Sequence, residues 1–339
     1  MENSGIRKPY DFGSLVRIEA CAAVGGKKEK AGPLGEYLDI FCEDEKLAKK
    51  TWENAESEMS RMALNTALSK AKRTDKDVDI VLAGDLMNQC TGAAYGLLRF
   101  DIPYFGLYGA CSTFAEALTL GAFMIASGKV KRVAAVVSSH FCTAERQYRF
   151  PLEYGSFSES TAQSTVTGSG AVILSAANGE EGGVYITGAL PGIVTDRGIK
   201  DAANMGAAMS GAAADTILRY FESGGEKPSD FDCIVTGDLG KEGKAIAGEM
   251  MKKRNPAVDA VYKDCGDMIY DTEKQDVGCG GSGCGCSAVV FCGYLWQSML
   301  KQRLRRCLLV GTGAMMSPQS LLQGQSIPAV AHLVKLESR

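Results

Sequence analysis

The sequence is poor in histidine and has no long apolar run. Only two histidines, His140 and His332, occur among 339 residues, so few imidazole groups are available for acid–base chemistry. No apolar run approaches the roughly 20 residues that a membrane-spanning helix needs. The 37 basic and 40 acidic residues are well mixed and leave a net charge of −3, without the basic stripe of nucleic-acid-binding proteins. We therefore expect no nucleic-acid partner and no membrane span.

Cysteine, by contrast, is abundant. The chain has 12 cysteines, and some of them, such as Cys233 and Cys307, lie inside apolar runs where reduced and buried thiols are expected. The first residues are polar and show no apolar secretory leader. These features favour a reducing compartment, and we expect a cytoplasmic protein.

Segments of the first half of the chain recur in the second half in the same order. Each is a continuous apolar run, the pattern of a strand that is buried on both faces of a sheet. The paired segments are residues 79–86 with 232–239, 131–139 with 305–313, and 168–176 with 331–337. The sequence therefore predicts an α/β fold made of two related halves, residues 1–179 and 180–339, joined by a polar, Gly-rich connector.

A cysteine stands at the start of an expected helix in the first half. The stretch GACST, residues 109–113, forms a turn of small residues before an apolar helical segment. The amino end of a helix presents unpaired N–H groups and a positive dipole end, which stabilise a thiolate and a developing oxyanion. Cys111 is therefore a candidate nucleophile, and a small buried cysteine in a tight turn is the alternative.

This order of motifs resembles the thiolase-like superfamily, which includes thiolases and ketoacyl synthases. The resemblance implies two βαβαβαββ halves in α-β-α-β-α layers, a nucleophilic cysteine at the place of Cys111, and usually a homodimer. It also implies a base and an oxyanion-stabilising partner, two histidines or a histidine and an asparagine. At the matching places this chain has Asp238, after the strand of residues 232–239, and Ser282, in the Gly-rich turn.

These replacements are unsuited to acyl transfer. A carboxylate repels an oxyanion, and its charge is expected to raise the pKa of a neighbouring thiol. A serine hydroxyl donates one hydrogen bond but is no base near neutral pH. The sequence therefore favours a binding protein on an enzyme scaffold. Acyl transfer or ketoacyl-synthase-like condensation through Cys111 is the alternative, and an interaction scaffold with a collapsed crevice is a third.

Further residues are candidates for lining a ligand crevice between the halves. They share a place at a strand end, in a Gly-rich turn or in the loop before a buried strand, where parallel sheets of this kind bind ligands. The candidates for binding a ligand are His140, Arg149, Gln163, Thr165, Asp238, Ser282, Gly283, Thr312 and Gly313. His332 lies in an apolar strand segment, where a structural role is expected.

The Gly-rich turn of residues 278–287, GCGGSGCGCS, contains three cysteines. Their spacing does not match the paired spacing of structural zinc sites, and no second pair accompanies them. We therefore expect no metal centre. The glycines are better explained by a backbone that passes close to a ligand or to the Cys111 turn, an approach that only glycine permits.

Several stretches are similar to a sporulation family within this superfamily. They include GACST, residues 109–113; RQYRFPLEYG, residues 146–155; and GGSGCGCSA, residues 280–288. The resemblance implies a protein that binds dipicolinic acid, with or without calcium, for uptake into the developing spore. It further implies no resident cofactor, membrane-embedded sporulation transport proteins as partners, and a peripheral place at the spore inner membrane through them.

Overall fold

The computed structural model describes residues 8–148, 159–177 and 182–339. The strands of the first half of the chain are β1 (Tyr10–Gly25), β2 (Ile40–Phe41), β3 (Ile80–Gly84), β4 (Tyr104–Gly106), β5 (Arg132–Ser139), β6 (Ser164–Thr165) and β7 (Gly168–Ala176). Those of the second half are β8 (Val184–Leu190), β9 (Cys233–Thr236), β10 (Tyr262–Asp264), β11 (Gly281–Ser282), β12 (Arg306–Ala314) and β13 (Ala329–Ser338). The predicted break between residues 179 and 180 lies outside the described residues, and the division into these two parts stays a prediction.

The main sheet has the same strand order on both sides of its centre. Among the described residues, eleven strands form this sheet in the order β10-β9-β12-β13-β8-β1-β7-β5-β3-β4, with β2 beside β1. Outward from β1 the strands are β7, β5, β3 and β4, and outward from β8 they are β13, β12, β9 and β10. The inner pairs β1–β7 and β8–β13 are antiparallel, whereas the pairs β5–β3 and β12–β9 are parallel. The duplicated α/β fold predicted from the repeated segments is therefore confirmed.

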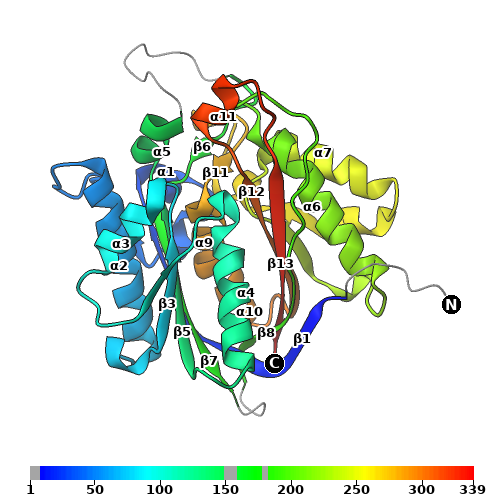
Figure 1. Cartoon of the computed structure of the whole chain (residues 1–339). Helices are drawn as coiled ribbons and strands as arrows, with labels where there is room; N and C mark the ends of the chain where they lie inside the picture. Colours follow the sequence, from blue (N-terminus) through cyan, green and yellow to red (C-terminus); the bar gives the residue numbers. More distant parts are fainter. Residues whose placement is uncertain (1–7, 149–158, 178–181) are drawn as a thin grey trace.

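The molecule has five layers: three layers of helices, with one half of the sheet between each neighbouring pair (Figure 1). One outer layer contains α2 (Trp52–Ala71) and α3 (Thr91–Leu97), and the other contains α6 (Met205–Glu222) and α7 (Gly240–Lys252). The central layer contains α4 (Thr113–Ala126), α9 (Cys284–Val290) and α10 (Trp296–Leu300). Shorter helices complete the fold: α1 (Lys27–Ala31), α5 (Phe141–Tyr148), α8 (Cys265–Ile269) and α11 (Pro318–Leu322). Within the described parts of the chain, no helix has the length and apolar content required to span a membrane.

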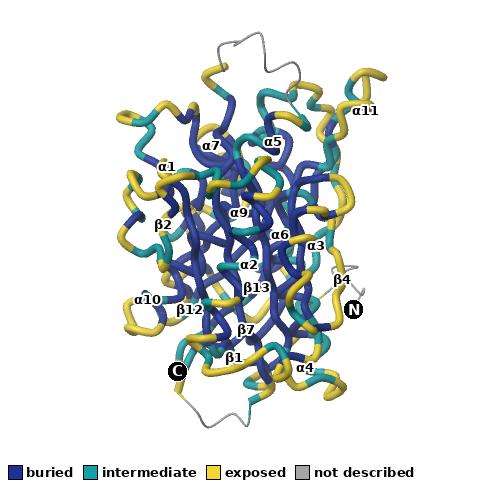
Figure 2. Tube along the Cα trace, turned by 90° about the vertical axis from the view of Figure 1, so that its left-hand side faces the viewer, coloured by how far each residue is buried: buried dark blue, intermediate teal, exposed yellow. Residues whose placement is uncertain are grey.

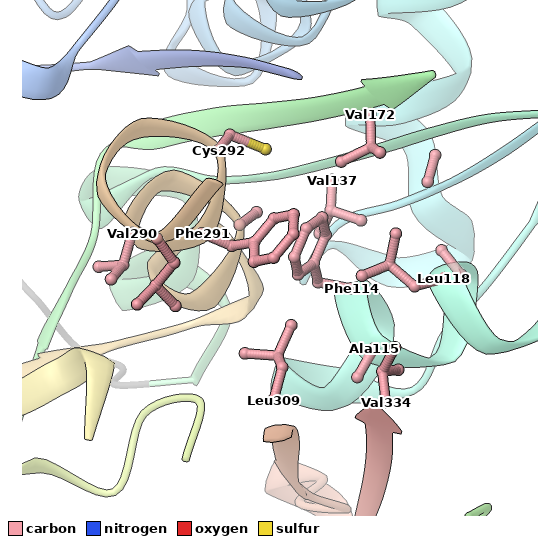
Figure 3. Packing of buried hydrophobic residues seen from close by; sticks show 14 of the residues in the cluster. Phe114, Ala115, Leu118, Val137, Val172, Val290, Phe291, Cys292, Leu309 and Val334 are labelled. Atoms are coloured by element: carbon pink, nitrogen blue, oxygen red, sulfur yellow. The ribbon is translucent and has the colours of Figure 1, made fainter. Parts of the chain in front are cut away.

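The main core lies around the central helices. Phe114 of α4 and Phe291, which follows α9, are fully buried, and their ring centroids are 5.6 Å apart (Figure 3). Apolar side chains from both halves of the sheet surround this pair, among them Val137, Val172, Leu309 and Val334. Figure 2 shows buried residues running through the centre of the molecule, with exposed residues at its periphery. Helices cover both faces of the sheet, which explains why its strands are continuous apolar runs in the sequence.

Candidate functional site

The Cys111 turn has the geometry that the sequence predicts. Residues Ala110–Ser112 form a 3-10 turn immediately before α4, so Cys111 lies at the amino end of a 14-residue helix. Ala110 adopts the left-handed conformation with a φ of +51°, which is uncommon for a residue with a side chain. The Thr113 hydroxyl donates to the Ala110 carbonyl at 2.7 Å and accepts from the Gly109 N–H at 3.1 Å. These bonds fix the backbone that presents Cys111.

The end of strand β12 lies directly against this turn. A β-carbon on Gly313 would be 2.7 Å from the Gly109 carbonyl oxygen and 2.9 Å from the Ser112 hydroxyl oxygen. Contacts of this kind are closer than a methyl group tolerates, so this position requires glycine. The Gly-Thr-Gly sequence thus lets the second half of the chain approach the candidate nucleophile of the first.

Asp238 lies at the centre of the site and is fully buried. Its Oδ1 accepts a hydrogen bond from the Thr312 hydroxyl at 2.7 Å. Its Oδ2 accepts from the Gly283 N–H at 2.9 Å and from the Ser282 hydroxyl at 3.3 Å. Burial is the main reason that the pKa of Asp238 is raised to about 7, and hydrogen bonds from the Cys111 thiol, the Thr312 hydroxyl and the Gly283 N–H oppose that effect.

Burial and the same carboxylate together keep Cys111 protonated. The pKa of the Cys111 thiol lies well above its ordinary value, first because the thiol is buried and then because of the charge of Asp238 and the hydrogen bond between the two side chains. The Gly283 N–H and the Ser282 hydroxyl act in the opposite direction without cancelling this effect. The expectation that an aspartate at this place raises the thiol pKa is confirmed. The structure therefore assembles Cys111, Asp238, Ser282, Gly283 and Thr312 as one cluster.

Gln163 and Thr165 lie beside this cluster but face different surroundings. Strand β6 pairs with β11 in parallel, which places Thr165 opposite Ser282. The Gln163 amide nitrogen donates to the carbonyl oxygens of Asp238 and Gly281, both at 2.7 Å, and so holds two loops of the site together. Thr165 lines the pocket in front of Cys111. A role for either side chain in ligand binding stays a prediction.

Neither histidine lies against the Cys111 sulfur. The His140 Nδ1 accepts from the Cys142 N–H, and its Nε2 donates to the Glu45 carbonyl, each at 3.1 Å. Burial lowers the pKa of His140, so the ring is neutral in this position. The His332 Nδ1 accepts from the Gly192 N–H at 3.1 Å. His140, which the sequence suggested as a ligand donor, is not among the residues that line the pocket at Cys111, and its role in ligand binding stays a prediction.

Asp264 supports the site and was not recognised in the sequence. Its carboxylate accepts hydrogen bonds from the backbone N–H groups of Leu239 and Gly240, each at 2.9 Å, and from the Thr236 hydroxyl at 2.6 Å. It therefore fixes the loop that carries Asp238. Burial raises the pKa of Asp264 to about 6. An aspartate at the end of a short strand gives no local signal of this role, because its partners are 24 to 28 residues away along the chain.

Two hollows with shared lining residues lie at the Cys111 turn. The inner pocket, with a volume of about 40 Å³, is mostly apolar and is lined by Leu86, Ala110, Cys111, Ala144, Glu145, Tyr148, Thr165, Met205, Ser282, Ala314 and Met316. A wider hollow of about 490 Å³, partly open to solvent and here called the vestibule, shares Ala110, Tyr148, Ala314 and Met316 with it. The candidate Arg149 lies outside the described residues.

Two of the three cysteines of the Gly-rich turn bond to backbone oxygens. The Cys279 thiol donates to the Thr161 carbonyl and the Cys284 thiol to the Ser138 carbonyl, both at 3.0 Å. In the described part of the chain, no three histidine, cysteine, aspartate or glutamate side chains gather in a way that could hold a metal ion. The turn instead brings the backbone of the second half close to the first: a β-carbon on Gly283 would be 2.9 Å from the Ser139 hydroxyl oxygen.

The fold is that of the thiolase-like condensing enzymes. A variant of OleA from Xanthomonas campestris superimposes with a TM-score of 0.62 and 13% sequence identity, covering 98% of this chain and 100% of that chain. The 3-oxoacyl-[acyl-carrier-protein] synthase III from Aquifex aeolicus superimposes with a TM-score of 0.54 and 12% identity, covering 95% of this chain and 99% of that chain. At these identities the likeness establishes the fold alone.

Within this class, the chain belongs to the Stage V sporulation protein AD (SpoVAD) family, whose model matches residues 7–337. The Stage V sporulation protein AD of Bacillus subtilis (strain 168) is 40% identical over 331 residues, which cover 98% of this chain and 97% of that protein. The resemblance drawn from the sequence motifs is thereby confirmed, and the chain is a sporulation protein with a condensing-enzyme fold.

Proposed function

We propose that this protein is a non-catalytic binding protein that holds dipicolinic acid, or its calcium chelate, for uptake into the developing spore. Membership of a sporulation family supports the biological setting. The observation that carries the non-catalytic part is the Cys111–Asp238 pair, because burial and the neighbouring carboxylate raise the pKa of the Cys111 thiol well above its ordinary value, so that it is not a thiolate near neutral pH. Both histidines are described, and both bond elsewhere, so neither imidazole takes the proton of this thiol.

Titration calorimetry with the purified chain tests this proposal directly. We expect a heat of binding with dipicolinic acid at or below millimolar ligand, and the same titration with equimolar calcium shows which form binds more tightly. Benzoic acid, which has one carboxylate and cannot chelate calcium in the same way, is the control ligand. Absence of heat with both forms of dipicolinic acid rejects the proposal.

The structural likeness to condensing enzymes makes acyl transfer the competing function. It requires an acyl thioester on Cys111, which has a defined mass and must be lost in a Cys111→Ala variant. Mass spectrometry of the intact protein after incubation with several acyl-CoA donors distinguishes the two functions. We expect no adduct, and an adduct that depends on Cys111 would establish the enzyme instead.

We further propose that the protein forms a homodimer through strand β4. This strand is the last in the sheet, and among the described strands it pairs only with β3. Phe105 is 55% exposed and Tyr104 is 39% exposed on it, an apolar edge that ordinarily invites pairing with another strand. A second copy would continue the sheet across a twofold axis. Docking to membrane-embedded sporulation transport proteins, and thus a peripheral place at the spore inner membrane, remains a proposal drawn from the family.

Replacing Phe105 with glutamate is expected to shift the protein from dimer to monomer, because the substitution places two like charges at the twofold contact. Light scattering coupled to size-exclusion chromatography measures the mass in solution. Leu322→Glu is the matched control, since Leu322 is 89% exposed on α11, away from the sheet edge. A monomeric parent protein, or a Phe105→Glu variant with an undiminished mass, would contradict this interface.

A further inference from the structure

The end of the sheet opposite the Cys111 turn carries a separate surface. Strands β5 and β12 begin at this end, at Arg132 and Arg306, and run toward the Cys111 cluster. The pairing register leads from one start to the other through the end of β7, the middle of β1, the start of β8 and the end of β13. Both starts therefore lie at the same end of the molecule, which is at the bottom in Figure 1, where the chain reaches its C-terminus.

The loop that enters each of these two strands is basic. The loop between α4 and β5 contains Lys129 and Lys131, and the loop between α10 and β12 contains Lys301, Arg303 and Arg305. All five side chains are exposed, and neither loop contains an acidic residue. None of the five forms an ion pair with another described residue. The duplicated fold thus places unpaired positive charge at the same end of both halves, in a chain whose net charge is −3.

One carboxylate lies beside each loop and bonds to its backbone. Asp79 accepts from two backbone N–H groups where the first loop enters β5, at 2.7 and 2.9 Å. Asp232 accepts from the corresponding two N–H groups where the second loop enters β12, also at 2.7 and 2.9 Å. These bonds hold the loops in the same way in both halves. Five cations and two carboxylates leave an excess of three positive charges on the two loops and their anchors.

Two leucines are exposed among these cations. Leu300, the last residue of α10, is 46% exposed and directly precedes Lys301. Leu15 is 51% exposed and lies where β1 passes from pairing with β8 to pairing with β7. Exposed apolar side chains next to unpaired cations are typical of surfaces that lie on anionic membranes, because the former enter the interface and the latter meet the headgroups. A nucleic acid would use the cations alone, so the leucines favour lipid.

The surface made by these side chains is here called the basic edge: Leu15, Lys129, Lys131, Leu300, Lys301, Arg303 and Arg305. We propose that the basic edge binds the anionic headgroups of a lipid bilayer directly. Because it lies at the end opposite Cys111, the hollows at the Cys111 turn stay open to water while the edge lies on the membrane. The inference goes beyond the proposed function, since it needs neither a transport protein nor dipicolinic acid.

Sedimentation of the full chain with lipid vesicles tests this proposal. We expect binding to vesicles of phosphatidylcholine with about one-third phosphatidylglycerol, and loss of that binding in pure phosphatidylcholine or in high salt. Each cation near an anionic surface changes the affinity about fivefold. The triple variant Lys301→Gln, Arg303→Gln and Arg305→Gln is therefore expected to bind about a hundredfold more weakly, and Lys129→Gln with Lys131→Gln about twentyfold.

A matched control removes the same charge from the other end of the molecule. Lys50→Gln, Lys200→Gln and Lys241→Gln replace three exposed lysines near the Cys111 end, and this variant is expected to bind vesicles within about threefold of the parent. A second contribution is tested by Leu15→Ser with Leu300→Ser, which is expected to weaken binding about tenfold. All substitutions are at exposed positions, and thermal unfolding checks that each variant is folded.

The outcomes are distinct from those of the ligand titrations. A parent protein that stays in the supernatant with phosphatidylglycerol vesicles overturns the proposal, as it would if the cations served an acidic protein partner instead. Equal binding to phosphatidylcholine alone, or equal losses in the basic-edge triple variant and its control, also overturns it. None of these results bears on the binding of dipicolinic acid, so the proposed function is judged separately.

Discussion

Replacing Asp238 with asparagine is expected to increase the rate of Cys111 alkylation at pH 8 by about tenfold or more. The substitution removes the negative charge that, together with burial, raises the thiol pKa. Nearby like charge shifts a pKa by about one unit or more, and below the pKa each unit changes the thiolate fraction about tenfold. Asparagine preserves the site because its oxygen can accept from Gly283 while its amide donates to the Thr312 hydroxyl.

Alkylation is measured peptide by peptide by mass spectrometry after timed exposure to iodoacetamide. Cys142 serves as an internal control, because among the described cysteines it alone is partly exposed and it lies outside the Asp238 cluster. Its rate is expected to be the same in both proteins. If Cys111 reacts no faster in the variant while Cys142 is unchanged, the carboxylate does not suppress the thiol, and the non-catalytic proposal loses its main support.

The same variant has a second readout in the pH dependence of stability. The folded-state pKa of Asp238 is raised to about 7, above the value of about 3.9 expected in the unfolded chain. The folded state then binds the Asp238 proton more tightly than the unfolded state does. The stability that this proton contributes is therefore fully present below about pH 4 and is lost as the pH rises through about 7. Urea denaturation at pH 5 and pH 8 should therefore show that Asp238→Asn gains stability relative to the parent protein at the higher pH.

The second large effect is expected from Gly280→Ala in the Gly-rich turn. Gly280 has a φ of +128°, where residues with a β-carbon are strained, and an added β-carbon would lie 2.6 Å from the Gly266 carbonyl oxygen. The backbone of Gly266 cannot move away easily, since it lies in α8, whose first turn is capped by Asp264 accepting from the Asp267 N–H at 3.0 Å. We expect a loss of about 3 kcal/mol or more in the free energy of unfolding, combining backbone strain with a steric clash.

Gly248→Ala is the matched control for this experiment. Gly248 lies inside α7, where an added β-carbon would make an ordinary contact of 3.8 Å with Tyr262. Alanine is favoured over glycine within a helix by about 1 kcal/mol, so this variant is expected to be as stable as the parent or slightly more stable. Urea denaturation measures both variants. Equal stabilities of the two variants would contradict the argument that the turn requires glycine at Gly280.

Much of the fold could be predicted from the sequence because the repeated segments are long, apolar and in the same order. A strand that is buried on both faces must consist almost entirely of apolar residues, so the corresponding strands of the two halves are recognisable as matching apolar runs. Cys111 was found for a similar reason: a turn of small residues followed at once by an apolar helix is a local signal. The replacement of the expected imidazole by Asp238 could likewise be predicted from its position in the motif.

The composition of the site could be predicted only in part. His140 follows a strand end, as a ligand-binding residue would, but both of its ring nitrogens bond to groups that the sequence did not indicate. Asp264 acts on a loop more than 20 residues away, and the vestibule combines Asn88 and Tyr108 with α11 from the far end of the chain. Contacts of this kind depend on how the elements pack, which no local pattern encodes.

The sequence by itself determined the duplicated α/β scaffold, the place of the thiol at a helix start and the lack of a nearby imidazole in the motifs. Only the tertiary structure decided that Asp238 is buried and bonded to Thr312 and Gly283, and that Cys111 is consequently held as a thiol. The physical reason is that burial and hydrogen bonding, which set the pKa of both groups, arise from segments more than 40 residues apart in the chain.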